Sequence, residues 1–245
     1  MMFQELSNRG FDIRYQAHAN ALLEVDFPEA VIDIEAILTN FHIQVAELVR
    51  GGGGEATITQ RLRRALEQKG WEKKVFRVSK TIDDVQTESN SHEIDHVGQY
   101  QKGTIALELE WNNKDPFYDR DLENFKRLHA DNAISLGIII TRGASIQASL
   151  YDLIQDYGRL NALASFDELD AHGIELTRRQ RSKFEDTITR RKIPFHEAWA
   201  VNFVRDKFGQ ATTHWAKLED RLARGVGNPC PFVGIGLPES IIIRG

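Results

Sequence analysis

The sequence of 245 residues predicts an α/β fold, in which helices flank a central mixed β-sheet. Residues 104–111 alternate apolar and polar side chains, as a strand does when one face is buried. Residues 133–141 are almost continuously apolar, which is typical of a strand buried on both faces and parallel to its neighbour. A helix is expected between them, with Asp115 as N-cap and Pro116 at its first position. The three segments predict a strand–helix–strand unit with a right-handed crossover.

Periodicity and turn signals place the other elements on either side of this unit. Four adjacent glycines, Gly51 to Gly54, suit either a flexible hinge or a close backbone approach to a ligand. In chain order the other expected elements are helices at 29–50 and 55–69, strands at 75–82 and 92–100 joined by a polar turn at 83–91, helices at 146–162, 177–192 and 195–224, and a strand at 232–237.

Composition and charge are ordinary for a globular protein of this length. The net charge of −5 argues against a general nucleic-acid coat but allows an enzyme that is basic only where phosphates bind. Cys230 is the only cysteine, so no internal disulfide can form, and a reducing cytoplasm suits the chain. No apolar run approaches the roughly 20 residues that span a membrane, and the first residues lack the pattern of a secretory signal. We therefore expect a cytoplasmic protein.

Three acidic residues can come together through the strand pattern. The alternation puts Glu108 and Glu110 on one side of their strand, about 6–7 Å apart along it. Asp95 lies 13 positions before Glu108 and follows an apolar residue, so a neighbouring strand can bring it alongside. Adjacent carboxylates suit Mg²⁺, which prefers hard oxygen ligands, and the pattern favours a metal-dependent nuclease. The alternative is a plain amphipathic strand whose glutamates are solvated.

The same stretch contains a competing motif. His92-Glu93-Ile94-Asp95-His96 fits H-E-x-x-H, which binds zinc when both histidines lie on one face of a helix. A polar segment precedes it, Gly98 and Gly103 follow it, and a β-pattern begins by Thr104. This context favours a strand, and a zinc protein is the less favoured alternative.

The segment from Ile94-Asp95 to Ile105-Ala106-Leu107-Glu108-Leu109-Glu110-Trp111-Asn112-Asn113 resembles the catalytic core of PD-(D/E)XK nucleases. More closely, it resembles type II restriction endonucleases of the BglII/BstYI kind, and Ile138 to Gly143 and the stretch 224–236 add to the likeness. The resemblance is good over 55–145 and loose over the last 20 residues. It implies a restriction-endonuclease-like core, with 55–245 as the catalytic and DNA-recognition domain. Residues 1–54 would be an N-terminal helical segment that forms one compact domain with it.

The resemblance also implies an activity. An enzyme of this kind hydrolyses phosphodiester bonds of double-stranded DNA at a short palindromic site, such as one containing GATC, and requires Mg²⁺. It would act as a homodimer in a cell that holds a cognate methyltransferase. A different PD-(D/E)XK nuclease, one that acts on DNA structures or repair intermediates, is the alternative.

The resemblance assigns roles to individual residues. Asp95 and Glu108 would bind the metal, and Glu110 would orient or deprotonate the attacking water. Glu110 departs from the pattern, because most of the superfamily has Lys there and this kind usually has Gln; the gap from Asp95 to Glu108 is also longer than usual. Glu55 resembles in position a helical glutamate that assists the metal in some relatives. The candidate DNA contacts are Asn112, Asn113, Lys114, Arg142, Ser145 and, in a basic segment, Arg191.

Overall fold

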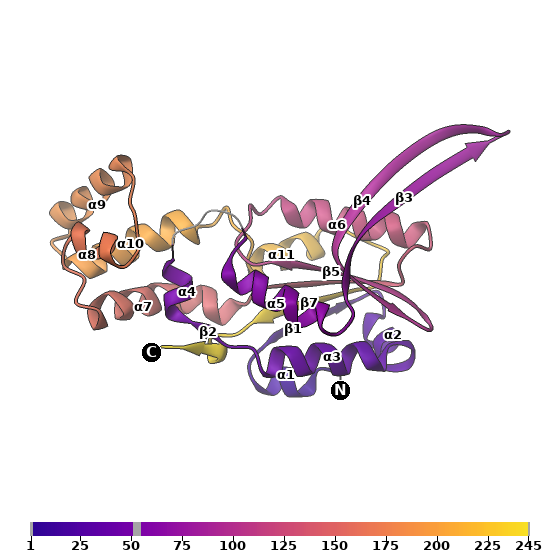
Figure 1. The fold of residues 1–245 in the computed structure, drawn as a ribbon, viewed down its shortest axis with the longest axis horizontal. Coiled ribbons are helices and arrows are strands. Elements are labelled where there is room, and N and C mark those ends of the chain that lie inside the picture. The colour runs from indigo at the N-terminus through magenta and orange to yellow at the C-terminus, as the bar shows by residue number, and fades with distance from the viewer. Residues whose placement is uncertain (1, 51–54, 245) are drawn as a thin grey trace.

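A mixed β-sheet forms the centre of the computed structural model, which describes residues 2–50 and 55–244 without the side chains of 80–82 and 86–90 (Figure 1). Within these residues, six strands follow the order β1-β7-β6-β5-β4-β3. They are β1 (Asp12–Gln16), β3 (Glu72–Ile82), β4 (Val85–Tyr100), β5 (Gly103–Glu110), β6 (Leu136–Arg142) and β7 (Phe232–Leu237). β5, β6 and β7 are mutually parallel, whereas β1, β4 and β3 pair antiparallel with their neighbours. The expected mixed α/β sheet is therefore confirmed.

The central strand–helix–strand unit forms as the sequence predicts. β5 pairs in parallel with β6, and helix α6 (Phe117–Ala130) connects them. The register places Glu108 beside Ile139 and Glu110 beside Thr141. Every residue of β6 is buried, as expected for a strand covered on both faces.

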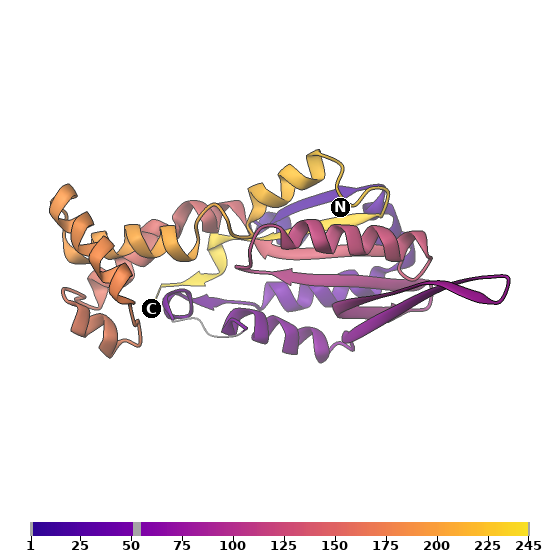
Figure 2. The same ribbon diagram turned by 90° about the horizontal axis from the view of Figure 1, so that it is seen from above.

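Helices cover both faces of the sheet (Figure 2). One face packs against α6 and α11 (Trp215–Ala223), through a cluster that includes Ala106, Leu122, Phe125 and Leu218. The larger cluster lies on the other face. The helices that contribute buried residues to it include α1 (Gln4–Asn8), α2 (Ala19–Asp26), α3 (Pro28–Thr39), α4 (Val45–Val49), α5 (Thr57–Glu67), α7 (Ala144–Leu160), α8 (Phe166–Ala171), α9 (Arg178–Arg191) and α10 (Phe195–Lys207).

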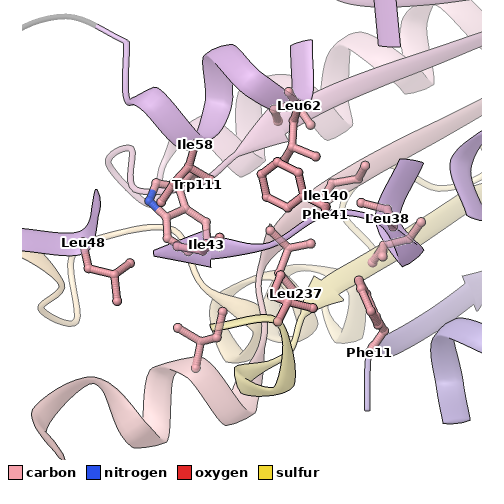
Figure 3. Packing of buried hydrophobic residues seen from close by; sticks show 14 of the residues in the cluster. Phe11, Leu38, Phe41, Ile43, Leu48, Ile58, Leu62, Trp111, Ile140 and Leu237 are labelled. Carbon is pink, nitrogen blue, oxygen red and sulfur yellow. The ribbon is translucent and has the colours of Figure 1, made fainter. Parts of the chain in front are cut away.

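The N-terminal segment belongs to this larger cluster and is not wholly helical. β1 forms the edge of the sheet beside β7, and β2 (Ile43–Gln44) pairs in parallel with β8 (Ile242–Ile243), which follows the short η1 (Glu239–Ile241). The helix expected over 29–50 is consequently two helices, α3 and α4, separated by β2. Figure 3 shows Ile43 close to Trp111, the residue that follows β5, and Leu48 in the same cluster. The glycines at 51–54 lie outside the described residues.

A long two-stranded ribbon of β3 and β4 projects beyond the helices, at the upper right of Figure 1. The polar turn expected over 83–91 is wrong, because only Asp83 and Asp84 form the turn and β4 begins at Val85. A ribbon that extends past the covering helices has no core to face, so its polar residues resemble those of a loop. An irregularity in the pairing of Glu72 and Lys74 with β4 marks where the ribbon leaves the sheet.

The opposite end of the molecule is a helical lobe of α8, α9 and α10 built on the end of α7 (Figure 1). Phe166, Phe184 and Phe195 make its centre, with ring centroids 4.6–5.4 Å apart. The single helix expected over 195–224 is two helices, α10 and α11, because the chain turns at 208–214. That turn returns the chain to the end of β5, where Thr213 N donates to Asn113 O.

No helix in the described ranges combines the length and the apolar character that crossing a membrane requires.

Candidate active site

Glu108 and Glu110 are buried on the α6 side of β5, with 4% and 2% of their surface exposed. Ile105, Leu107 and Leu109 lie in the cluster on the other face, so the expected alternation holds. The alternative of solvated glutamates is wrong, since α6 covers this face of β5. Two glutamates so close and so dry are costly unless they have a cation or a proton.

Asp95 lies beside Glu108 on the adjacent strand. Its backbone N donates to Glu108 Oε1 at 3.4 Å, next to the antiparallel pair His96 and Leu107. Its carboxylate is half exposed and lies 3.4 Å from Lys73 Nζ. β4 therefore brings the aspartate to the glutamates despite the long gap in sequence between them.

A fourth acid, Asp121 of α6, joins this cluster and was missed by the sequence analysis. Its side chain is 1% exposed, and Oδ1 accepts a hydrogen bond from Arg120 Nε at 2.8 Å. Arg120 Nη2 also lies 3.7 Å from Glu110 Oε1. A signal was present: Asp121 follows Tyr118 and precedes Phe125 at spacings of three and four, on the apolar stripe of the helix.

The electrostatics of these acids follow from burial and mutual repulsion. Burial raises the pKa of Glu108 well above its ordinary value, and the charges of Asp121 and Asp95 raise it further. Burial and then Asp121 raise the pKa of Glu110 to about 9. Burial also raises the pKa of Asp121, although Arg120 opposes the effect. Each carboxyl group therefore favours a nearby cation.

The donor set fits a hard divalent cation. All four side chains offer carboxylate oxygens, which Mg²⁺ prefers, and Asp121 Oδ2 is buried without a hydrogen-bond partner among the described residues. In the described part of the chain, no three His, Cys, Asp or Glu side chains are placed so that they could hold a metal ion as they stand. Two cations contact the cluster: the Arg120 guanidinium at Glu110 and Asp121, and Lys73 at Asp95.

The segment after β5 is held by several hydrogen bonds. Asn113 Nδ2 donates to Glu110 Oε2 at 2.9 Å, so this side chain contacts the candidate catalytic group. Asn112 Nδ2 donates to Lys207 O at 2.9 Å, and Asn112 Oδ1 accepts from Arg142. Lys114 is exposed and bridges to Thr212. Of the three residues expected to contact DNA here, Asn113 and Lys114 are exposed, whereas the amide of Asn112 is used within the protein.

Arg142 does not lie where a DNA contact requires. It is 0% exposed, and it donates to Gln147, Trp111 O, Asn112 and Thr212 at 2.8–3.3 Å. Burial lowers the pKa of Arg142 to about 10, which leaves it charged at neutral pH. The sequence expectation for Arg142 is corrected: it joins the ends of β5 and β6 to α7 and the 208–214 turn.

Three further expected site residues lie away from the carboxylates or are otherwise engaged. Glu55 pairs with Arg63 at 3.2 Å and lies just ahead of α5, which packs in the larger cluster on the face away from Glu108 and Glu110, so its expected metal role is corrected. Ser145 Oγ accepts from Glu239 N at 2.9 Å and thereby holds the C-terminal segment. Arg191 is exposed at the end of α9 in the helical lobe.

The zinc interpretation is wrong. His92 and His96 lie on strand β4, so they do not share the helical face that H-E-x-x-H requires. His92 Nδ1 contacts Asn124 Oδ1 at 2.9 Å, whereas His96 is buried and burial lowers its pKa.

The mixed sheet, together with the acids on β5 and β4, defines a nuclease with a restriction-endonuclease-like core. The family model described as restriction endonuclease BglII/BglIII matches residues 11–237, so the chain belongs to this family. Membership makes it a DNA-cleaving hydrolase of a restriction system, with double-stranded DNA as its substrate. No individual curated protein matches the chain by sequence.

Proposed function

We propose that the protein is a Mg²⁺-dependent type II endonuclease that hydrolyses DNA at a short palindromic site, with Asp95, Glu108 and Glu110 as its catalytic acids. The observation that carries the proposal is the burial of Glu108 and Glu110 beside Asp95, on a central strand of a mixed α/β sheet. A fold alone can require a buried apolar strand there, but it does not require two dry glutamates on one face.

The chain supplies binding groups and a proton acceptor. When bound, Mg²⁺ would offset the charge that develops on the phosphate and lower the pKa of the attacking water. Glu108 and Asp95 would hold the ion, and the backbone of Asp95 already contacts Glu108 Oε1. Asn113 holds Oε2 of Glu110 in place. Once a cation offsets the charge of the neighbouring acids, Glu110 would ionise and accept the proton of the water. Glu110 would act as a general base at the position where the resemblance leads us to expect Gln or Lys.

The proposed activity also has consequences for the oligomeric state of the protein and for the cell that makes it. One set of carboxylates cuts one strand at a time, so cleavage of both strands at a symmetric site favours a homodimer with one set on each strand. An enzyme that cuts at a short site also threatens its own genome, which favours a partner methyltransferase and a cytoplasmic location beside the DNA. Lys114 and Arg191 are our candidates for phosphate contacts, since both are exposed cations.

Digestion of a plasmid and a phage genome tests the proposal. We expect discrete bands with Mg²⁺ and uncut DNA with a chelator, and sequencing of the ends should give one palindrome. Glu108→Gln is the matched control and should leave the DNA intact. A smear of random lengths, or cutting only at branches and lesions, would favour the structure-specific alternative, and cleavage by Glu108→Gln would remove the assigned site.

A further inference from the structure

Asp121 occupies a position at which a helix normally buries an apolar residue. Its neighbours on the same stripe of α6 are Tyr118, Leu122 and Phe125, all of them fully buried. It does not cap the helix, because α6 begins at Phe117 and its N-cap is Pro116. A carboxylate in this position costs folding free energy that Ala or Leu would not, so its presence requires a reason other than packing.

The carboxylate of Asp121 shares a cation with a candidate catalytic glutamate. Arg120 Nη2 lies 2.7 Å from Asp121 Oδ1 and 3.7 Å from Glu110 Oε1. Asp121 therefore lies within the group of acids and not at its margin.

The contacts of Asp121 leave part of its side chain unsatisfied. Oδ1 accepts from Arg120, at 2.8 Å from Nε and 2.7 Å from Nη2. Oδ2 has no partner among the described residues. The Arg120 side chain is 53% exposed, lies over the ring of Phe117 at 4.4 Å, and can move outward without breaking a buried network.

We propose that Asp121 is a further acidic ligand of the metal site, and that Arg120 is the resident cation that a divalent ion displaces from it. The inference rests on the proposed function. The acidic ligand that a helix supplies to the metal site would then be Asp121 of α6, which follows β5 in sequence, and not Glu55, which precedes β5.

The competing explanation is a plain ion pair that fixes α6. An ion pair whose cation is half exposed contributes little to stability, too little to offset a fully buried carboxylate. The two explanations differ in a measurable way. If the pair is only structural, Asp121→Asn and Arg120→Gln remove the same interaction and act alike. If Asp121 is a ligand and Arg120 competes with the ion, the two variants act in opposite directions.

Titration with Mn²⁺, followed by electron paramagnetic resonance of the free ion, separates these outcomes in the absence of DNA. We expect Asp121→Asn to weaken Mn²⁺ binding at least tenfold and Arg120→Gln to strengthen it about threefold or more. The double variant should resemble Asp121→Asn. Arg127→Gln, which removes an exposed cation paired with Glu123 on the same helix, is the matched control and should leave binding unchanged.

Glu108→Gln distinguishes a failure of this inference from a failure of the proposed function. Loss of Mn²⁺ binding in Glu108→Gln, with wild-type binding in Asp121→Asn, would overturn the inference and keep the function. Wild-type binding in both would overturn the two together. A change of Mn²⁺ affinity in the same direction for Asp121→Asn and Arg120→Gln would also overturn the inference. Because Arg120 is at the surface, Arg120→Gln should fold and test the inference even if Asp121→Asn fails to fold.

Discussion

β5 and β6 each end in a buried charged group, yet the two ends differ in how those groups are satisfied. At the end of β6, Arg142 makes four hydrogen bonds to surrounding groups. Near the end of β5, Glu108, Glu110 and Asp121 of α6 are buried with few hydrogen-bond partners, and burial raises the pKa of each carboxyl group. A buried charge with a full set of partners holds the fold together. A buried charge that lacks them is suited to a ligand that the protein does not itself supply.

The two ends are joined, so the satisfied one supports the other. Thr141 Oγ1 donates to Glu110 O at 2.7 Å, and Arg142 Nη1 donates to Trp111 O at 3.3 Å. The backbone at Glu110 and just after it is therefore fixed by β6. A proton acceptor must be held within fractions of an ångström, and this is the contribution we assign to Arg142.

The largest effect on cleavage should come from substitutions of the buried carboxylates near the end of β5. Glu108→Ala should reduce cleavage at least about a thousandfold, since electrostatic stabilisation and ion binding are lost together. Cognate binding in a gel-shift assay should persist, because base and phosphate contacts come from other residues. Asp95→Asn and Glu110→Ala should also reduce cleavage severely. His92→Ala is the control on the same strand; if it were as inactive as Glu108→Ala, the carboxylates would not be what sets this end apart.

At the end of β6, substitution of Arg142 should mainly affect the stability of the fold. Arg142→Met leaves the acceptors at Trp111 O, Asn112 and Gln147 unpaired, and we expect a loss of about 1–3 kcal/mol in the free energy of unfolding by urea denaturation. Arg142→Lys should restore only part of it, since an ammonium cannot reach all four partners. An unchanged stability in Arg142→Met would contradict the contrast between the two ends.

The buried carboxylates near the end of β5 should also make the stability of the protein depend on pH. Glu110 binds a proton up to a pKa of about 9 when folded but only to about 4.5 when unfolded, so the folded state holds the extra proton between these values. Without divalent ions, stability should therefore fall as pH rises from about 5 to 9, by up to about 1.4 kcal/mol per pH unit for each such proton. Glu110→Gln should flatten the slope and stabilise the protein at pH 8. Glu123→Gln, exposed on α6, is the control; an equal slope in Glu110→Gln and wild type would contradict the assigned burial.

A smaller effect is expected at Asn113, which the sequence analysis assigned to base reading. Its amide donates to Glu110 Oε2, so Asn113→Ala should lower kcat about tenfold by releasing the proton acceptor. If Asn113 also reads a base, cognate affinity should fall by about 1–3 kcal/mol while random DNA binds as before. Single-turnover rates and competition binding separate the two roles. Equal losses for cognate and random DNA with an unchanged rate would exclude both.

The sequence predicted the sheet and the two glutamates because both depend on local pattern. The alternation around Glu108 and the apolar run ending in Ile140 each identify a strand, and the parallel pairing follows from burial on both faces. It failed for β1, whose place at the sheet edge depends on pairing with β7 more than 200 residues later. It also failed for the ribbon, where Val85 begins a strand in a stretch that has no buried face to reveal it.

In the site, the errors have a common cause. An arginine after a strand suits DNA equally well whether it points outward or inward, and only the long-range hydrogen bonds to Thr212 and Asn112 settle that Arg142 points inward. Glu55 was favoured by analogy, although its helix packs on the far face. Asp121 was hidden because an acidic residue on an apolar helical stripe was not compared with the acids of the neighbouring strand.

The most direct test of the contrast is divalent-ion binding at both ends, measured by Mn²⁺ paramagnetic resonance on Glu108→Gln and Arg142→Lys, each confirmed as folded by circular dichroism. The account predicts that Glu108→Gln loses Mn²⁺ affinity by at least tenfold, whereas Arg142→Lys binds the ion within about threefold of wild type despite its lower stability. Wild-type Mn²⁺ affinity in folded Glu108→Gln would contradict the account, because the unsatisfied carboxylates would then not be the metal site.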